Sequence, residues 1–127
     1  METLPGNPLI LYVDDEELLR EVASIMIEDH GGRCIVACDG RDALTKFQEQ
    51  SGEIDFVYMD YSMPEMNGYE TIVEIRKIRP DIPIVVVSGL DISPEVEELR
   101  QQGKVGFLSK PFREVDLIDS FRTYTGQ

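Results

Sequence analysis

Charged residues follow three of the short apolar segments of the chain. Asp14 and Asp15 come directly after the first segment, Asp60 after the third, and Lys110 after the last. Short apolar runs bounded by turn residues are typical of buried strands in a parallel sheet. If the strands run parallel, these charges gather at one carboxyl edge, where open α/β sheets bind ligands. Three carboxylates held together repel one another unless a cation joins them. The pattern therefore predicts a divalent metal, a carboxylate beside it and an ammonium group opposite, a site that can handle phosphate.

The rest of the chain alternates between the hydrophobic periods of strands and helices. Strands are predicted at residues 9–13, 33–38, 55–59, 84–87 and 105–108. Each is followed by apolar residues at helical spacing, and short loops join the segments. This alternation indicates right-handed βαβ crossovers and a three-layer α/β sandwich. We expect a single domain over residues 1–127, of which residues 1–8 form a flexible N-terminal segment.

Two of the predicted helices have features that bear on function. In the first, helical spacing predicts one apolar stripe facing the core, formed by Leu18, Val22, Ile25 and Met26. The fourth begins with Ser93 as its cap and Pro94 at its first position. Its clear core residues are Val96 and Leu99 alone, so we expect it to be among the looser elements.

Composition limits the classes of partner and compartment. The chain has 127 residues, of which 42% are hydrophobic, as expected of a globular domain. Its 12 basic and 25 acidic residues give a net charge of −13, which repels nucleic acid and anionic membranes, so we expect neither as a partner. No apolar stretch approaches the ~20 residues of a membrane span, and residues 1–8 do not resemble a signal peptide. We expect a cytoplasmic protein.

The cysteines and the one histidine do not suggest a second site. Cys34 and Cys38 fall in the predicted second strand, where four strand steps would separate their Cα atoms by ~13 Å, beyond the ~7 Å limit for a disulfide. With His30 they give three possible zinc ligands, but the chain has no fourth cysteine or histidine. We interpret them as buried structural thiols and His30 as a solvated residue without a phosphodonor context.

The motifs as a set resemble the receiver domain of two-component response regulators, over roughly Leu9 to Phe121. Any one of them is weak evidence, but their order, each at a strand end, is specific. They are Asp14-Asp15, the segment from Asp60 to Gly68, Ser88-Gly89 and the segment from Gly106 to Phe112. The resemblance implies a flavodoxin-like sheet in the order 2-1-3-4-5 with helices on both faces.

The resemblance also implies a role for each charged residue. Asp60 would accept a phosphoryl group from a phosphohistidine donor. Asp14, Asp15, Asp60 and the backbone carbonyl of Ser62 would hold Mg²⁺ or Mn²⁺, since such ions prefer oxygen ligands. Lys110 would pair with a phosphoryl oxygen as a point charge. We expect such a protein not to be an enzyme in the usual sense, because it would catalyse only its own phosphorylation and dephosphorylation.

Two further residues would respond to phosphorylation. In the family a hydroxyl residue moves toward the phosphoryl group and an aromatic residue of the fifth strand swings inward behind it. Here these would be Ser88 and Phe107, although a permanently buried core aromatic is the alternative for Phe107. The bond between Lys110 and Pro111 would be cis.

The partners implied are a histidine kinase or histidine phosphotransfer protein, and a downstream protein bound by the fourth helix, fifth strand and fifth helix. The chain would be a monomer or a phosphorylation-dependent dimer. Its motifs are similar to those of receiver modules at the ends of hybrid histidine kinases, so we expect either such a module or a single-domain regulator.

Three other interpretations are open to these residues. Asp14 and Asp15 could merely cap the first helix, which is compatible with metal binding. A degenerate receiver acting as a non-phosphorylated interaction module usually lacks one of the acidic or lysine positions, and none is missing. A phosphotransferase of the haloacid dehalogenase type needs a second aspartate two residues after the nucleophile, where Ser62 stands, and a substrate-capping insert.

Overall fold

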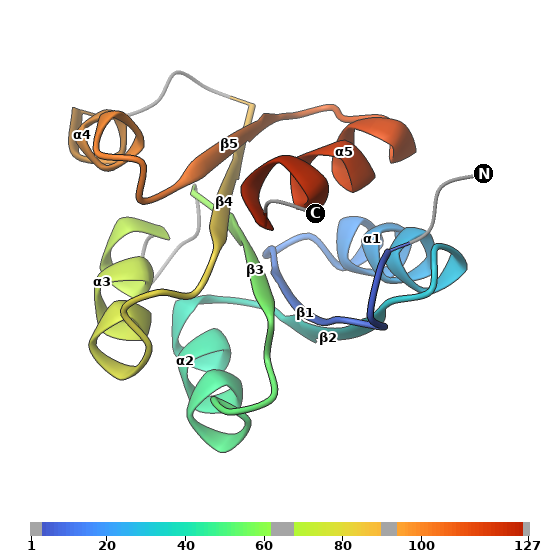
Figure 1. Ribbon diagram of the computed structural model, residues 1–127, viewed down its shortest axis with the longest axis horizontal. Coiled ribbons are helices and arrows are strands. Elements are labelled where there is room, and N and C mark those ends of the chain that lie inside the picture. Colours follow the sequence, from blue (N-terminus) through green and yellow to red (C-terminus); the bar gives the residue numbers. More distant parts are fainter. Residues whose placement is uncertain (1–3, 62–67, 90–93, 126–127) are drawn as a thin grey trace.

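The computed structural model describes residues 4–61, 68–89 and 94–125, in which strands and helices alternate (Figure 1). The elements are β1 (Leu9–Val13), α1 (Glu17–Asp29), β2 (Arg33–Ala37), α2 (Gly40–Glu49), β3 (Phe56–Asp60), α3 (Gly68–Ile78), β4 (Ile84–Ser88), α4 (Pro94–Gln101), β5 (Gly106–Ser109) and α5 (Glu114–Thr125). All strand pairs are parallel, in the order β2-β1-β3-β4-β5. The predicted fold class and strand order are confirmed.

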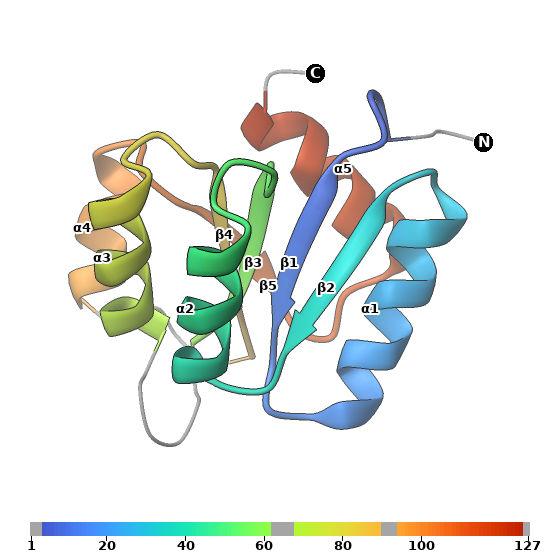
Figure 2. The ribbon, with the colours of Figure 1, turned by 90° about the horizontal axis from the view of Figure 1, so that it is seen from below.

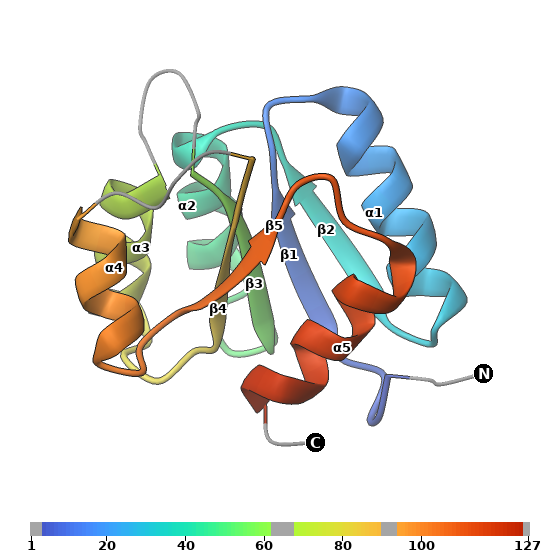
Figure 3. The ribbon, with the colours of Figure 1, turned by 90° about the horizontal axis from the view of Figure 1, so that it is seen from above.

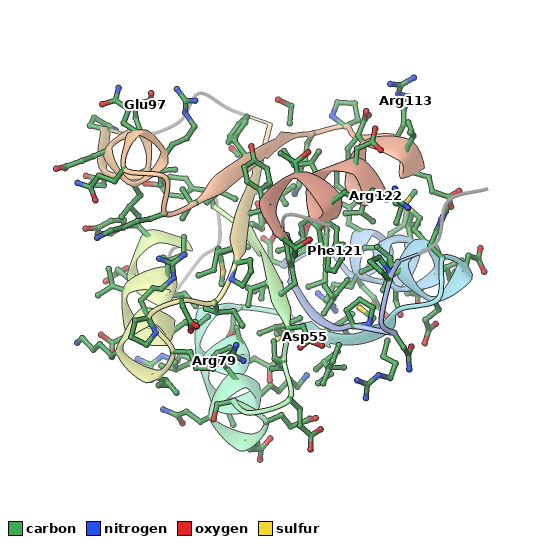
Figure 4. The ribbon with its side chains drawn as sticks, viewed as in Figure 1. Asp55, Arg79, Glu97, Arg113, Phe121 and Arg122 are labelled. Atoms are coloured by element: carbon green, nitrogen blue, oxygen red, sulfur yellow. The ribbon has the colours of Figure 1, made fainter. Side chains whose placement is uncertain are left out.

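Helices cover both faces of the sheet. Helices α1 and α5 lie on one face, and α2, α3 and α4 on the other (Figure 1). Successive side chains of a strand point to opposite faces, so β1 sends Tyr12 to the α1–α5 side and Leu11 to the other. Every residue of β1, β3 and β4 is buried, which explains their nearly continuous apolar sequences. In Figure 4, Phe121 of α5 lies against the sheet, while Glu97 and Arg113 extend outward.

The carboxyl ends of the strands lie along one edge of the molecule. The connections from β1 to α1 and from β2 to α2 are at this edge, and the last turn of α5 is at the opposite one (Figures 2 and 3). The register pairs Val13 with Met59 and Asp60 with Val87, so neighbouring strands end nearly level. Residues that directly follow the strands are thereby brought close together.

The exposed side of α1 differs from the prediction. Leu18 and Ile25 are 70% and 58% exposed, whereas Ala23 and Ile27 are completely buried. The prediction was therefore wrong: the stripe that faces the core lies about one residue position further around the helix. Ile27 packs where Gly32 has no side chain, since a Cβ at Gly32 would lie 2.8 Å from the Ile27 Cγ2. Apolar spacing alone could not distinguish these adjacent stripes.

The start of the chain was expected to be flexible, but from Leu4 onward it packs against the core. Leu4 is 4% exposed, and its amide donates to the His30 carbonyl oxygen at 2.6 Å. Further along, the Arg33 amide donates to the Pro8 carbonyl oxygen at 2.8 Å. His30 itself is buried, with its Nε2 3.3 Å from the Glu114 Oε2, so the prediction of a solvated histidine was wrong.

The cysteines also differ in part from the prediction. Both are free thiols; Cys34 in β2 is partly buried, and burial raises its pKa to about 12. Cys38 is exposed because β2 ends at Ala37, one residue earlier than predicted. In α4, Pro94 is the first residue and Val96 is buried as expected. The predicted cap, Ser93, lies outside the described residues.

Burial of Leu4 predicts that the N-terminal segment contributes to stability. Leu4→Ala should lower the free energy of unfolding by about 2–4 kcal/mol, because it removes buried methyl groups and leaves a cavity. Urea denaturation measures this, with Leu18→Ala as the matched control. Leu18 is 70% exposed, so its truncation should change stability by less than about 0.5 kcal/mol. Equal effects of the two substitutions would contradict the packing of Leu4.

Candidate phosphate and metal site

Three carboxylates meet at the carboxyl edge of the sheet. Asp14 follows β1 and is completely buried, and Asp60 is the last residue of β3 and is 3% exposed. Asp15 is exposed, and one carboxylate oxygen from each of the three residues lies within 4.8 Å of the others. Strands β1 and β3 are neighbours in parallel register, which sets Asp14 beside Asp60. The structure thus brings together the acidic residues predicted to bind metal.

Lys110 supplies the positive charge within this group. It follows β5, and its Nζ lies 3.0 Å from the Asp14 Oδ2 and 3.4 Å from the Asp60 Oδ1. Burial acts to lower the pKa of Lys110, but the Asp14 and Asp60 carboxylates outweigh burial and raise it. The ammonium group is therefore charged at neutral pH and is shared between the two buried carboxylates.

The environment of Asp60 weakens its acidity. Burial raises the pKa of Asp60, the nearby Asp14 carboxylate raises it further, and Lys110 lowers it. The result is a pKa of about 6 against an ordinary value of 3.8. One ammonium group thus compensates only part of the cost of placing Asp60 next to Asp14 out of water.

These residues fit a small divalent cation. Two buried carboxylates and one exposed carboxylate face a single lysine, so the group keeps an excess of negative charge. All three ligands offer hard oxygen atoms, and the exposed Asp15 faces solvent, from which an ion with its own water ligands could enter. Asp14, Asp15 and Asp60 would hold the ion. The further ligand predicted, the carbonyl of Ser62, lies outside the described residues.

Asp14 is also bonded to the start of α1. Its Oδ1 accepts the Glu16 amide at 2.9 Å, while Glu16, the cap residue of α1, makes no side-chain cap of its own. In addition, the Arg20 Nη1 donates to the Asp14 carbonyl oxygen at 2.9 Å. Asp14 therefore binds the turn before the helix with one oxygen and the lysine with the other. The cap position belongs to Glu16, so neither Asp14 nor Asp15 is the cap residue of α1.

The two predicted switch residues lie on β4 and β5. Ser88 ends β4 and is 4% exposed, and its carbonyl oxygen accepts the Lys110 amide at 3.0 Å. Phe107 of β5 is partly buried against the core cluster on the α2–α4 side of the sheet. Its role as a switch or as a fixed core residue stays a prediction. The peptide bond between Lys110 and Pro111 is cis, as the resemblance implies.

Sequence reasoning gave no role to two contributors to the site. The Tyr12 hydroxyl lies 3.5 Å from the Asp14 Oδ2, and burial followed by the Asp14 charge raises the pKa of Tyr12 well above its ordinary value, which keeps it a proton donor. Gly68 lies so close that a Cβ there would come within 2.9 Å of the Asp60 carbonyl oxygen. The one available signal for Tyr12 was its position two residues before Asp14, which places both side chains on one face.

Comparisons with known proteins agree with this geometry. The sequence model of the response regulator receiver domain matches residues 10–122. The chain is similar to the chemotaxis protein CheY of Thermotoga maritima, with 35% identity over 87% of this chain and 92% of that protein. It is also similar to the sensor kinase CckA of Brucella abortus, with 37% identity over 86% of this chain but only 12% of the kinase.

Solved structures give the same result. CheY4 of Vibrio cholerae superposes with a TM-score of 0.84 at 30% identity, over 94% of this chain and 99% of that one. The receiver domain of the hybrid histidine kinase CckA superposes with a TM-score of 0.78 at 28% identity, over 91% and 97% of the two chains.

Within the described ranges, no helix has both the length and the apolar character needed to cross a membrane.

The raised pKa of Asp60 predicts a stability change on substitution. Without metal at pH 7, Asp60→Asn should raise the free energy of unfolding by roughly 1–3 kcal/mol, because ionised Asp60 is disfavoured in the folded state. The gain should shrink as the pH falls from about 6 toward 4, where Asp60 of the wild type becomes protonated. Urea denaturation in EDTA at pH 7 and at pH 4 measures the difference in the free energy of unfolding between the variant and the wild type.

The control for this experiment is Asp119→Asn, at an exposed position on α5. It should leave stability within about 0.5 kcal/mol of the wild type at either pH. An Asp60→Asn variant no more stable than the wild type at pH 7 would show that the charge at Asp60 carries no such cost.

Proposed function

The chain belongs to the response regulator receiver domain family, and we propose that it accepts a phosphoryl group from a phosphohistidine donor onto Asp60 in the presence of Mg²⁺. The observation that carries this proposal is the convergence of Asp14, Asp15 and Asp60 with the Lys110 ammonium at one edge of the sheet. The family membership and the sheet topology support the assignment. The activity is confined to the protein's own phosphorylation and dephosphorylation.

The proposed reaction transfers a phosphoryl group from a histidine of the donor protein to Asp60. An Asp60 carboxylate oxygen forms the new oxygen–phosphorus bond while the nitrogen–phosphorus bond of the donor histidine breaks, and the imidazole leaves with the electron pair. With a pKa of about 6, Asp60 is mostly ionised at neutral pH and retains its nucleophilic form. Bound Mg²⁺ would neutralise charge on the phosphoryl oxygens. Lys110, already 3.4 Å from Asp60, can then pair with one of these oxygens.

The output would be a shift in the populations of the conformations that the face formed by α4, β5 and α5 adopts. A phosphoryl group adds charge and acceptor oxygens beside Ser88, the buried last residue of β4. Phe107 is only partly buried, so an inward movement would bury more of its ring. Helix α4 buries Val96 completely and other residues only in part, so it is held by a small apolar contact. A downstream protein would bind this face.

Exposed apolar residues on α1 offer a docking surface for the phosphodonor. Leu18 and Ile25 are seven positions apart, on the same side of α1, and both are more than half exposed. A cleft beside them is lined by Glu17, Arg20, Glu21, Ser24, Ile25 and Val36. Large apolar side chains gathered on a charged surface mark contact sites. Because α1 begins two residues after Asp15, a histidine kinase or histidine phosphotransfer protein bound here would face Asp60.

Incubation with acetyl phosphate and Mg²⁺ tests the chemistry. Intact-mass measurement should detect one phosphoryl adduct on the wild type and on Asp119→Asn, and none on Asp60→Asn, which lacks the nucleophile. EDTA should abolish the adduct. No adduct on the wild type would favour the interaction-module alternative, and an equal adduct on Asp60→Asn would exclude Asp60 as the acceptor.

Ile25→Glu tests the docking surface. It should slow transfer from a phosphorylated histidine phosphotransfer protein by about tenfold, since a charge replaces an apolar contact worth roughly 1.4 kcal/mol. Its rate with acetyl phosphate should equal that of the wild type. Ile78→Glu, at the far end of α3, is the matched control and should behave like the wild type with both donors. Equal rates for the two variants with the protein donor would argue against docking on α1.

A further inference from the structure

Two tyrosines occupy equivalent positions before the two buried aspartates. Tyr12 stands two residues before Asp14 on β1, and Tyr58 stands two residues before Asp60 on β3. The tyrosines are partners in the parallel register, both are completely buried, and their ring centroids are 6.0 Å apart. Successive side chains of a strand point to opposite faces, so each of these two tyrosines lies on the same face as the aspartate two residues after it.

The two hydroxyl groups nevertheless point to different destinations. The Tyr12 hydroxyl is directed to the site, where it donates to the Asp14 Oδ2 at 3.5 Å. The Tyr58 hydroxyl is directed to α5, where it donates to the Leu117 carbonyl oxygen at 2.8 Å and lies 2.9 Å from the Ser120 Oγ. Similar rings in similar positions therefore serve different parts of the molecule.

Tyr12 holds an oxygen that otherwise depends on Lys110. The Asp14 Oδ1 is fixed by the Glu16 amide at 2.9 Å, whereas the Oδ2 contacts the Lys110 Nζ at 3.0 Å and the Tyr12 hydroxyl. The Lys110 ammonium also contacts Asp60. If Lys110 turns toward a phosphoryl group, as proposed above, Tyr12 is the donor that remains on the Asp14 Oδ2.

We propose that Tyr12 is a positioning residue, whose hydroxyl fixes the orientation of the Asp14 carboxylate toward a bound divalent cation. The inference rests on the proposed function, because it assumes that Asp14 serves as a metal ligand. Hydrogen bonds to metal ligands from groups behind them orient those ligands, and their loss typically costs 10–100-fold in metal affinity or activity. A phenylalanine at position 12 keeps the ring and its packing but loses this bond.

The two tyrosines provide a matched experiment. Titration of Mg²⁺ into metal-free protein, followed by amide chemical shifts in ¹H–¹⁵N NMR spectra, should give a Kd about tenfold higher for Tyr12→Phe than for the wild type. Tyr58→Phe makes the same chemical change away from the metal, and its Kd should stay within about twofold of the wild-type value. Both variants should unfold at a lower temperature than the wild type.

Phosphorylation kinetics provide a second readout. With acetyl phosphate, Tyr12→Phe should react slowly at low Mg²⁺ and approach the wild-type rate at saturating Mg²⁺. An unchanged Mg²⁺ Kd for Tyr12→Phe, or equal losses of affinity in both variants, would overturn the inference and leave Tyr12 a structural residue. If the wild type itself neither bound Mg²⁺ nor became phosphorylated, the proposed function would fail first, and this inference with it.

Discussion

Burial of like charge beside a single lysine is the constraint on which the rest of this structure depends. Asp14 and Asp60 are almost inaccessible to solvent, and their oxygens lie close to each other and to those of Asp15. The Lys110 ammonium contacts both buried carboxylates but can offset only one unit of charge. The remaining repulsion is expressed in the raised pKa of Asp60. A cation at this site would relieve that repulsion, so the affinity for an ion and the repulsion among the carboxylates have the same origin.

The parallel sheet is what makes such a concentration of charge possible. All strands run in the same direction, so their carboxyl ends lie at one edge of the sheet. Asp14, Asp60 and Lys110 lie at this edge, at the ends of β1, β3 and β5. Their interiors are apolar on both faces, so charged side chains are confined to the strand ends. The helices on the two faces shield the sheet from solvent. The fold and the site are thus consequences of one arrangement.

This arrangement explains which features could be predicted from the sequence. Strand-end charges predict a shared site because the geometry of a parallel sheet decides where strand ends lie. The face of α1 could not be predicted in the same way, since Leu18 and Ala23 belong to adjacent stripes and packing against Gly32 selects between them. The burial of His30 depends on Leu4 and on α5, which are distant in sequence. An aromatic residue within an apolar strand is typical of a core. The position of Tyr12 two residues before Asp14 does not single out its hydroxyl, because Tyr58 has the same position relative to Asp60.

The site is assembled from the beginning, middle and end of the chain, and this has a consequence for biogenesis. Asp14, Asp60 and Lys110 approach one another only when β1, β3 and β5 have joined one sheet. A nascent or truncated chain without β5 would have its acidic residues but no lysine opposite them. Competence for phosphorylation would then report completed folding, so that a partly folded chain could not compete for the phosphodonor. The wide separation of the site residues would thereby couple the proposed phosphorylation to completed folding.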